Sequence, residues 1–204
     1  MRLPRIVSCI ATWLTAFVPL SVTAIEFSVK HTQVGGPTLH AVVAGPSQIV
    51  AVGANGTVFL SENGEQWEQL SSVGGWTLRG VTYGNGVFVA VGDGGAFVRS
   101  TDGRNWVTVG PSITSARLNA VSYYGDGFLS VGEDGTVINS SDGTNWAPLG
   151  ENAVPAFYDL RTAEWAGPGN APFVGGTFGM AGLVSSDFRY VFNVPQNPGE
   201  RFSS

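Results

Sequence analysis

The sequence has few of the residues that carry most protein chemistry. It contains one cysteine, Cys9, and two histidines, His31 and His40, among 204 residues. The absence of a His-x-x-x-His pair and of a cysteine cluster argues against a transition-metal site, because such sites draw their ligands from these residues. The sequence also has no Gly-x-Ser-x-Gly elbow and no Gly-x-x-x-x-Gly-Lys loop. We therefore expect no metal, no cofactor and no catalytic residue.

Charged residues are scarce as well. They make up 12% of the chain, and acids outnumber bases by 15 to 10, which gives a net charge of −5. A surface of this sign does not bind nucleic acid or an anionic membrane by charge alone. With 29 glycines and 11% aromatic residues, the composition indicates an all-β protein with many tight turns rather than a disordered chain.

The first 24 residues have the pattern of a secretory signal peptide. Arg2 and Arg5 precede an apolar stretch, and the small-residue pattern Val22-Thr-Ala24 follows it. The stretch is too short for a membrane anchor and is interrupted by Pro19. Because Cys9 lies inside it, we expect a mature protein without disulfides, located in the periplasm or outside the cell and without a membrane span.

A repeat organises the rest of the chain. Residues 50–67, 89–106 and 129–146 are nearly the same sequence, and Trp67, Trp106 and Trp146 end the three copies. A fixed period of about 40 residues is typical of solenoids and propellers, in which no single unit buries its own apolar faces.

Each repeat has the pattern of a four-stranded antiparallel meander, shown by strands expected over 78–83, 87–92, 96–99 and 106–109. The turn between the second and third strands is Asn55-Gly56, Gly94-Gly95 or Asp134-Gly135. These pairs favour positive φ at both positions, which a type I′ hairpin requires. The second strand is apolar on both faces, which predicts that like units stack on it from both sides.

The third turn has the most specific pattern, a serine, an Asx-Gly pair and a tryptophan. Its residues are Ser61, Asn63, Gly64 and Trp67; Ser100, Asp102, Gly103 and Trp106; and Ser140, Asp142, Gly143 and Trp146. Here the chain resembles the Asp-box, or BNR-repeat, β-propellers, whose motif is Ser-x-Asp-x-Gly-x-x-Trp or a close variant. The short acceptor can bond N–H groups of its own turn. The resemblance implies that these residues are structural and lie at the blade periphery.

A fourth copy over 157–194 is degenerate, since no glycine follows Asp187 and Val191 stands in place of the tryptophan. We therefore predict an all-β propeller domain over 25–194, with four-stranded blades at about 39–70, 78–109, 118–149 and 157–194. A strand at 26–30 would complete the last blade, and 195–204 would form an unstructured tail. About four blades leave three alternatives: a small closed propeller, an open arc that self-associates with a second copy, or part of a longer propeller.

Four polar residues form the candidate binding site. His40, Arg79, Asn119 and Tyr158 follow the leading apolar residue of each first strand, and they differ while their neighbours repeat. First strands line a propeller's channel, so these side chains would converge there on a ligand, or simply face channel water. The acids Asp93, Glu133 and Asp134 lie at repeated turn positions, as solvated turn residues or as calcium ligands.

Two functions remain. Similarity to the Asp-box proteins that look like photosystem II stability and assembly factors implies a non-catalytic scaffold for a protein or peptide client. The alternative is a sialidase-type glycosidase or a glycan-binding module. Sialidases need three arginines, a Tyr-Glu nucleophile pair and an acid. When the repeats of this chain are aligned with one another, the three arginines Arg79, Arg117 and Arg161 fall at different positions of the repeat. This difference favours the scaffold.

Overall fold

The fold is described from a computed structural model of the chain. The structure describes residues 36–110, 113–149, 154–168, 170–184 and 191–193. All of these residues belong to one compact unit. The predicted signal peptide at 1–24, the strand at 26–30 and the tail at 195–204 lie outside these residues. Within the described part, no helix is long and apolar enough to cross a membrane.

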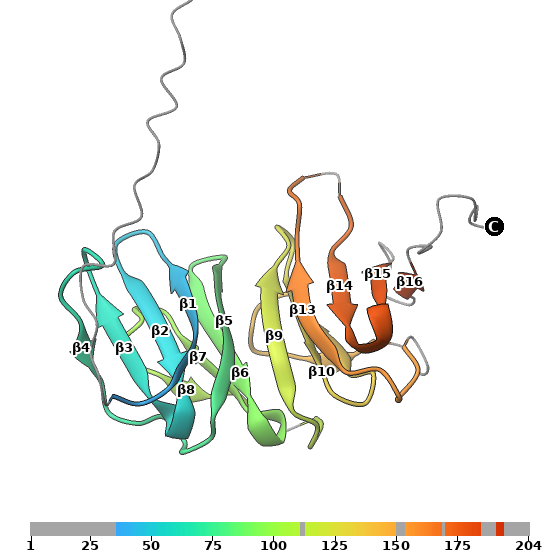
Figure 1. Cartoon of the computed structure of the whole chain (residues 1–204). Coiled ribbons are helices and arrows are strands. Elements are labelled where there is room, and N and C mark those ends of the chain that lie inside the picture. Colours follow the sequence, from blue (N-terminus) through green and yellow to red (C-terminus); the bar gives the residue numbers. More distant parts are fainter. Residues whose placement is uncertain (1–35, 111–112, 150–153, 169, 185–190, 194–204) are drawn as a thin grey trace, which may run out of the picture. The chain divides into compact units, whose positions relative to one another are not determined.

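The described residues form four antiparallel sheets of four strands each (Figure 1). Blade 1 contains β1 (Leu39–Ala44), β2 (Ile49–Gly53), β3 (Val58–Ser61) and β4 (Glu68–Gln69). Blade 2 contains β5 (Leu78–Gly84), β6 (Val87–Gly92), β7 (Phe97–Ser100) and β8 (Val107–Thr108). Blade 3 contains β9 (Leu118–Tyr123), β10 (Phe128–Gly132), β11 (Val137–Ser140) and β12 (Ala147–Pro148). Blade 4 contains β13 (Leu160–Glu164), β14 (Phe173–Gly176), β15 (Ala181–Val184) and β16 (Val191–Asn193).

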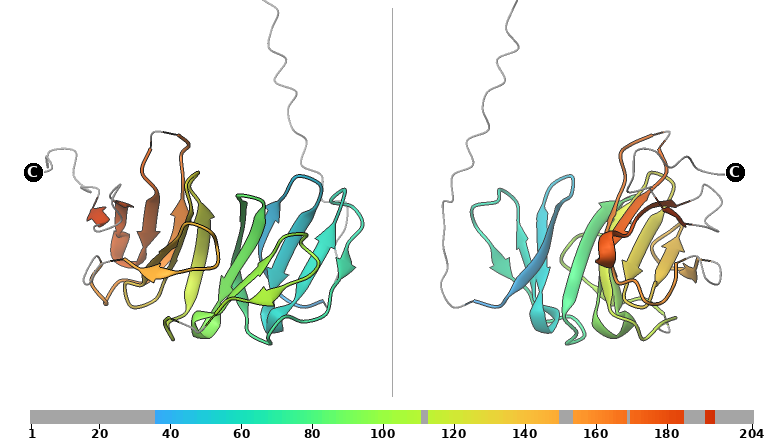
Figure 2. Two further views of the ribbon diagram at one scale, coloured as in Figure 1. Left: turned by 180° about the vertical axis from the view of Figure 1, so that it is seen from behind. Right: turned by 45° about the vertical axis from the view of Figure 1, so that its right-hand side comes forward.

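In every blade the strands pair in chain order, so each blade is a simple meander. The first strands β1, β5, β9 and β13 are neighbours in that order, and the blades therefore follow one another around a common side (Figure 2). This arrangement is a partial β-propeller of about four blades, and it confirms the fold class predicted from the repeat.

The turn between the second and third strands is confirmed as a type I′ turn in three blades. Its two central residues have φ of 55° and 68° at Asn55-Gly56, 66° and 68° at Gly94-Gly95, and 54° and 64° at Asp134-Gly135. The amide of Thr57 donates to the carbonyl of Ala54 across the first of these turns, at 3.0 Å. These turns correspond to the segments η1 (Ala54–Gly56) in blade 1 and η2 (Asp93–Gly95) in blade 2, whose central residues are left-handed rather than helical.

The core lies between blades rather than inside any one of them. Every residue of β6 is buried. Phe88 and Ala90 pack with Val50 and Val52 of blade 1, whereas Val89 faces the other way, toward blade 3. A third cluster joins blades 3 and 4. Both faces of an interior blade are therefore covered by its neighbours, as expected for a sheet that is apolar on both sides.

Candidate functional site

The same irregularity opens the first strand of each blade. A leucine pairs with the glycine that ends the second strand, as Leu78 does with Gly92, and Gly80 then pairs with Val91. Arg79, between them, has no partner residue in the ladder, which makes it the extra residue of a β-bulge. Bulges re-aim a side chain and often occur beside functional sites.

The bulge identifies equivalent residues in all four blades. The extra residues are His40, Arg79, Asn119 and Arg161. Three of these are candidates predicted from the sequence, and they lie on the neighbouring strands β1, β5 and β9.

Tyr158 occupies a different place from the one predicted. It precedes β13, and Arg161 takes the position that corresponds to Arg79. The similarity between the repeats suggests that Phe157 is equivalent to Leu118. In the structure Leu160 is the equivalent residue, because it pairs with Gly176 as Leu118 pairs with Gly132. The sequence itself contains a signal for this register. Aligning Leu160 and Gly176 with Leu118 and Gly132 requires a shorter insertion in the hairpin than aligning Phe157 with Leu118 does. The correction also puts Arg79 and Arg161 at the same repeat offset.

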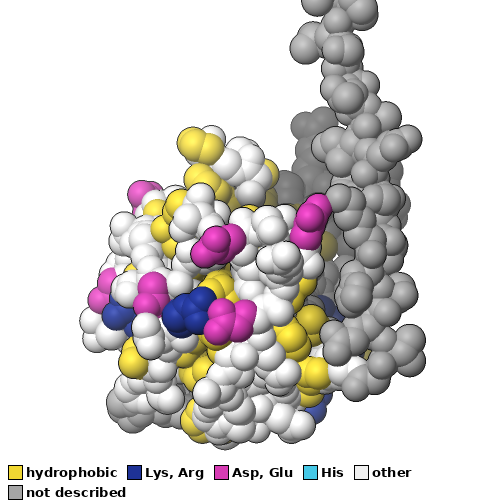
Figure 3. All heavy atoms as spheres, turned by 90° about the vertical axis from the view of Figure 1, so that its left-hand side faces the viewer, with side chains coloured by type: hydrophobic (Ala, Val, Ile, Leu, Met, Phe, Trp, Pro, Cys, Tyr) yellow, Lys and Arg dark blue, Asp and Glu magenta, His cyan; other side chains and the backbone are white. Residues whose placement is uncertain are grey.

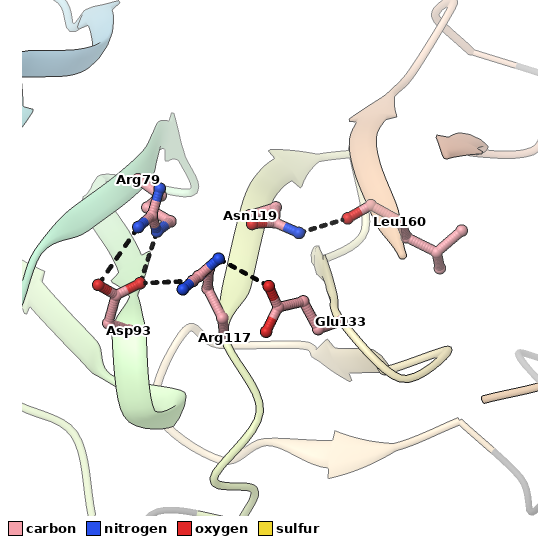
Figure 4. Close-up of polar contacts among 6 residues, drawn as sticks. All are labelled: Arg79, Asp93, Arg117, Asn119, Glu133 and Leu160. Atoms are coloured by element: carbon pink, nitrogen blue, oxygen red, sulfur yellow. Dashed lines mark hydrogen bonds and ion pairs between the residues drawn. The ribbon is translucent and has the colours of Figure 1, made fainter. Parts of the chain in front are cut away.

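Asn119 already has a partner within the protein. Its Nδ2 donates a hydrogen bond to the carbonyl oxygen of Leu160, at 2.7 Å (Figure 4). The bond joins the first strands of blades 3 and 4. Asn119 therefore links two blades, and its Oδ1 and the second hydrogen of its Nδ2 are the groups that could bond to a ligand.

Arg79 belongs to an ionic network that the sequence analysis did not predict (Figure 4). Its Nε and Nη2 donate to Oδ1 and Oδ2 of Asp93, at 2.5 and 3.3 Å. Arg117 approaches the same carboxylate from blade 3, with Nε 3.1 Å from Oδ1, and its Nη1 donates to Glu133 at 2.7 Å. Hydrogen bonding from Arg79 lowers the pKa of Asp93, and the charge of Arg117 adds to the effect.

The network contains two arginines and two carboxylates, so its charges balance. All four side chains reach solvent, with exposed fractions between 28% and 45%. Arg161 is exposed and forms no ion pair with any other described residue. This end of the first strands therefore presents guanidinium groups to solvent, and carboxylates hold two of them, those of Arg79 and Arg117, in place.

The acids at the turn positions do not form a metal cluster in the described part of the chain. Asp93 and Glu133 bind arginines instead. Asp134 lies in the type I′ turn with φ of 54°. Calcium binding by Asp93 or Glu133 would therefore have to compete with Arg79 and Arg117.

The third-turn motif bonds to itself. In blade 3, Asp142 Oδ1 accepts the amide protons of Thr144 and Asn145, at 2.8 and 2.7 Å, and the hydroxyl proton of Ser140 at 3.1 Å. The amide of Asn145 is the largest of the contributions that lower the pKa of Asp142 to about 2. Because the oxygens of this carboxylate accept hydrogen bonds from its own turn, Asp142 is poorly placed for acid catalysis.

The equivalent residues of the other blades behave alike. Asp102 accepts the amides of Arg104 and Asn105, at 2.9 and 2.7 Å, and its pKa is lowered mainly by Asn105. Asn63 accepts the two corresponding amides of blade 1, at 2.9 and 3.0 Å. An asparagine thus replaces the aspartate with the same geometry, which shows that the turn needs an acceptor rather than a charge.

Comparison with known proteins gives structural relatives only. No protein-family model and no curated protein matches the chain. A structure of YCF48 bound to a D1 peptide is similar with a TM-score of 0.63 and 16% identity, over 81% of this chain and 55% of that chain. YCF48 from Cyanidioschyzon merolae is similar with a TM-score of 0.60 and 18% identity, over 82% and 59%. The chain therefore spans little more than half the length of these relatives.

A third solved structure is comparable in extent. The computationally designed Ika4 protein is similar with a TM-score of 0.56 and 14% identity, over 82% of this chain and 96% of that chain. At these identities the likenesses show the fold and do not by themselves assign a function.

Proposed function

We propose that this chain is an exported, non-catalytic propeller scaffold that binds a protein or peptide client at the bulge end of its first strands. The observation that carries the proposal is the set of four bulge residues. All four are polar and they are of three kinds, His40, Asn119 and the two arginines Arg79 and Arg161, whereas the residue before each of them is a leucine. Packing accounts for the repeated positions, and ligand recognition accounts for four polar groups at one end of neighbouring strands.

The chemistry of the site favours a client that carries a carboxylate. Guanidinium groups grip carboxylates and backbone carbonyls with paired hydrogen bonds. Arg79 and Arg117 are held by Asp93 and are partly exposed, so a client carboxylate can replace or share that partner without leaving a buried charge unpaired. Arg161 adds an exposed cation on blade 4. The similar fold of YCF48 bound to a D1 peptide supports a peptide as the class of client.

Export rests on residues 1–24, with their two arginines, apolar stretch and Val22-Thr-Ala24 pattern. Expression in a bacterium with an intact export pathway should place the chain in the periplasm or medium. N-terminal sequencing should then read Ile25-Glu-Phe. A chain that stays in the cytoplasm with Met1 intact would contradict export.

The binding test compares two arginines that both form two-pronged ion pairs. Arg79 lies at the bulge, whereas Arg104 lies at the third turn of blade 2 and holds Glu68 of blade 1 through two bonds of 2.8 Å. An array of peptides with free or amidated C-termini would identify binding sequences, and fluorescence anisotropy would measure their affinity. We expect Arg79→Ala to weaken binding about tenfold or more, the value of one or two charged hydrogen bonds. Arg104→Ala should change it little.

Two outcomes would overturn the proposal: equal loss in both variants, or no peptide bound by the native chain. A third concerns the glycosidase alternative, in which the arginines would hold a sugar carboxylate. Sialoside and aryl glycoside substrates should not be hydrolysed. Turnover that disappears in Arg79→Ala would replace the scaffold function by an enzymatic one.

A further inference from the structure

One face of blade 1 is exposed, although the corresponding face of blades 2 and 3 is covered by a neighbouring blade. Leu78 and Val81 of β5 face blade 1 and are 0% and 8% exposed. Leu118 and Val121 of β9 face blade 2 and are 0% and 7% exposed. The corresponding residues of β1 are Leu39 and Val42, which are 47% and 63% exposed. The same apolar positions are therefore present in blade 1 without a cover.

The third turn of blade 1 shows the same difference. A Cβ at Gly103 would lie 3.0 Å from Val50 of the preceding blade, and one at Gly143 would lie 2.9 Å from Val89 of its preceding blade. At Gly64 the nearest atom belongs to Ile49 of the same blade. Trp67 is 40% exposed, whereas Trp106 and Trp146 are more deeply covered. Figure 3 shows apolar side chains among polar ones on this side of the molecule.

Blade 4 carries the opposite kind of free face. In blade 1, Val50 pairs with Leu60, and both pack against blade 2 with at most 6% exposed. The corresponding pair in blade 4 is Phe173 and Leu183, which are 36% and 37% exposed. Two kinds of blade face meet in each of the three interfaces between blades, and the described residues leave one face of each kind exposed.

We propose that a second copy of this chain covers both faces, with blade 4 of each copy packed on blade 1 of the other. The contact continues the blade-on-blade interface that is already repeated three times in one copy. Two such contacts related by a twofold axis close a ring, whereas other rotations would continue into a longer assembly. The ring has about eight blades, at the upper end of the usual range for propellers.

Closure also completes the line of bulge residues. Within one copy, His40 on β1 and Arg161 on β13 are exposed at the two ends of that line. In the ring, β1 would lie next to β13 of the partner, which is the first strand of the partner's blade 4. His40 would then lie beside the partner's Arg161. The assembly is independent of any client, so it is tested separately from peptide binding.

The test uses exposed residues whose replacement should leave a single copy folded. Val42→Glu puts a charge on the free face of blade 1, and Leu183→Glu puts one on the free face of blade 4. Val107→Glu is the matched control, because Val107 is 58% exposed on the outer strand of blade 2 and faces neither contact. Light scattering after size exclusion would give the mass, and circular dichroism would confirm the fold of each variant.

We expect the native chain and Val107→Glu to have the mass of two copies, and Val42→Glu and Leu183→Glu to have half that mass. A mixture of Val42→Glu and Leu183→Glu should regain two-copy particles, because one contact in such a pair has both faces intact. A native chain that is monomeric at micromolar concentrations would overturn the proposal. This is the result expected if the N-terminal residues of the same copy cover the exposed face of blade 1. So would a mass unchanged in Leu183→Glu, which would indicate that two blade 1 faces meet.

Discussion

Arg117 belongs to blade 3, yet its Nε donates a hydrogen bond to Oδ1 of Asp93 in the turn of blade 2, 3.1 Å away. Asp93 also binds Arg79 of its own blade, so one carboxylate holds two arginines from two blades. Both the placement of Arg79 and part of the adhesion between blades 2 and 3 therefore depend on Asp93.

Asp93→Asn should lower the free energy of unfolding by about 1 kcal/mol, a modest value because the site is partly exposed and screened. Urea unfolding at low salt would measure the loss, and it should shrink in 1 M NaCl. Glu68→Gln is the matched control in the exposed Arg104 pair and should have a smaller effect. An equal effect of the two substitutions would mean that Asp93 has no special role between blades.

Asp142 should make the protein sensitive to acid. Folding lowers its pKa from 3.8 to about 2, so the carboxylate stabilises the fold fully above about pH 4, and this contribution is lost as the pH falls through 2. Unfolding free energies measured from pH 5 to pH 2 should therefore fall more steeply for the native chain than for Asp142→Asn. The asparagine keeps an acceptor, as Asn63 does in blade 1, but it does not titrate in this range. Parallel curves would contradict the assigned role.

At neutral pH the acceptor itself can be tested at the same position. Asp142→Ala should lower the free energy of unfolding by about 1–2 kcal/mol, since it leaves the turn amides without a partner. Asp142→Asn should recover most of this loss. Binding of a peptide client should persist in both variants at temperatures where the fold persists.

The third-turn tryptophans should differ in their contribution to stability. Trp106 packs against the cluster between blades 1 and 2, and its Nε1 donates to the carbonyl of Gly103 at 2.8 Å. Trp106→Ala should therefore cost about 3 kcal/mol or more. Trp67→Ala should cost less, because Trp67 lies on the uncovered face of blade 1. Denaturant midpoints would rank the two, and an unchanged midpoint in Trp106→Ala would show that its ring is not part of the core.

The sequence predicted what depends on local, repeated chemistry. Asn-Gly, Gly-Gly and Asp-Gly pairs specify positive φ by themselves, so three type I′ turns could be predicted. The apolar residues on both faces of the second strand likewise predicted the stacking of blades. These features depend on neighbours in the chain and occur in three copies, which makes errors in one copy easy to detect.

What the sequence did not predict depends on contacts between distant residues or on a departure from the repeat. The bond from Arg117 to Asp93 joins residues whose counterparts in blade 1 are uncharged, Thr38 and Ala54, so no repetition pointed to it. In blade 4 the register followed Leu160 and Gly176, while the local resemblance of Phe157-Tyr158 to Leu118-Asn119 suggested another. Arg161 was missed as a site residue for that reason.

Phe178 departs furthest from the repeat, and it gives the last prediction. It has φ of 54° at the position held by Asn55, Gly94 and Asp134 in the other blades, and its side chain is 85% exposed. The left-handed region costs an ordinary residue about 1–2 kcal/mol, and asparagine adopts it more readily. Phe178→Asn should therefore raise the free energy of unfolding by about 1 kcal/mol, and the reciprocal Asn55→Phe should lower it. The ring of Phe178 lies edge-on to Tyr158, with centroids 6.5 Å apart, which is too exposed a contact to offset the strain. Urea titration of both variants would check the pair, and a loss of stability in Phe178→Asn would show that the ring contact outweighs the backbone cost.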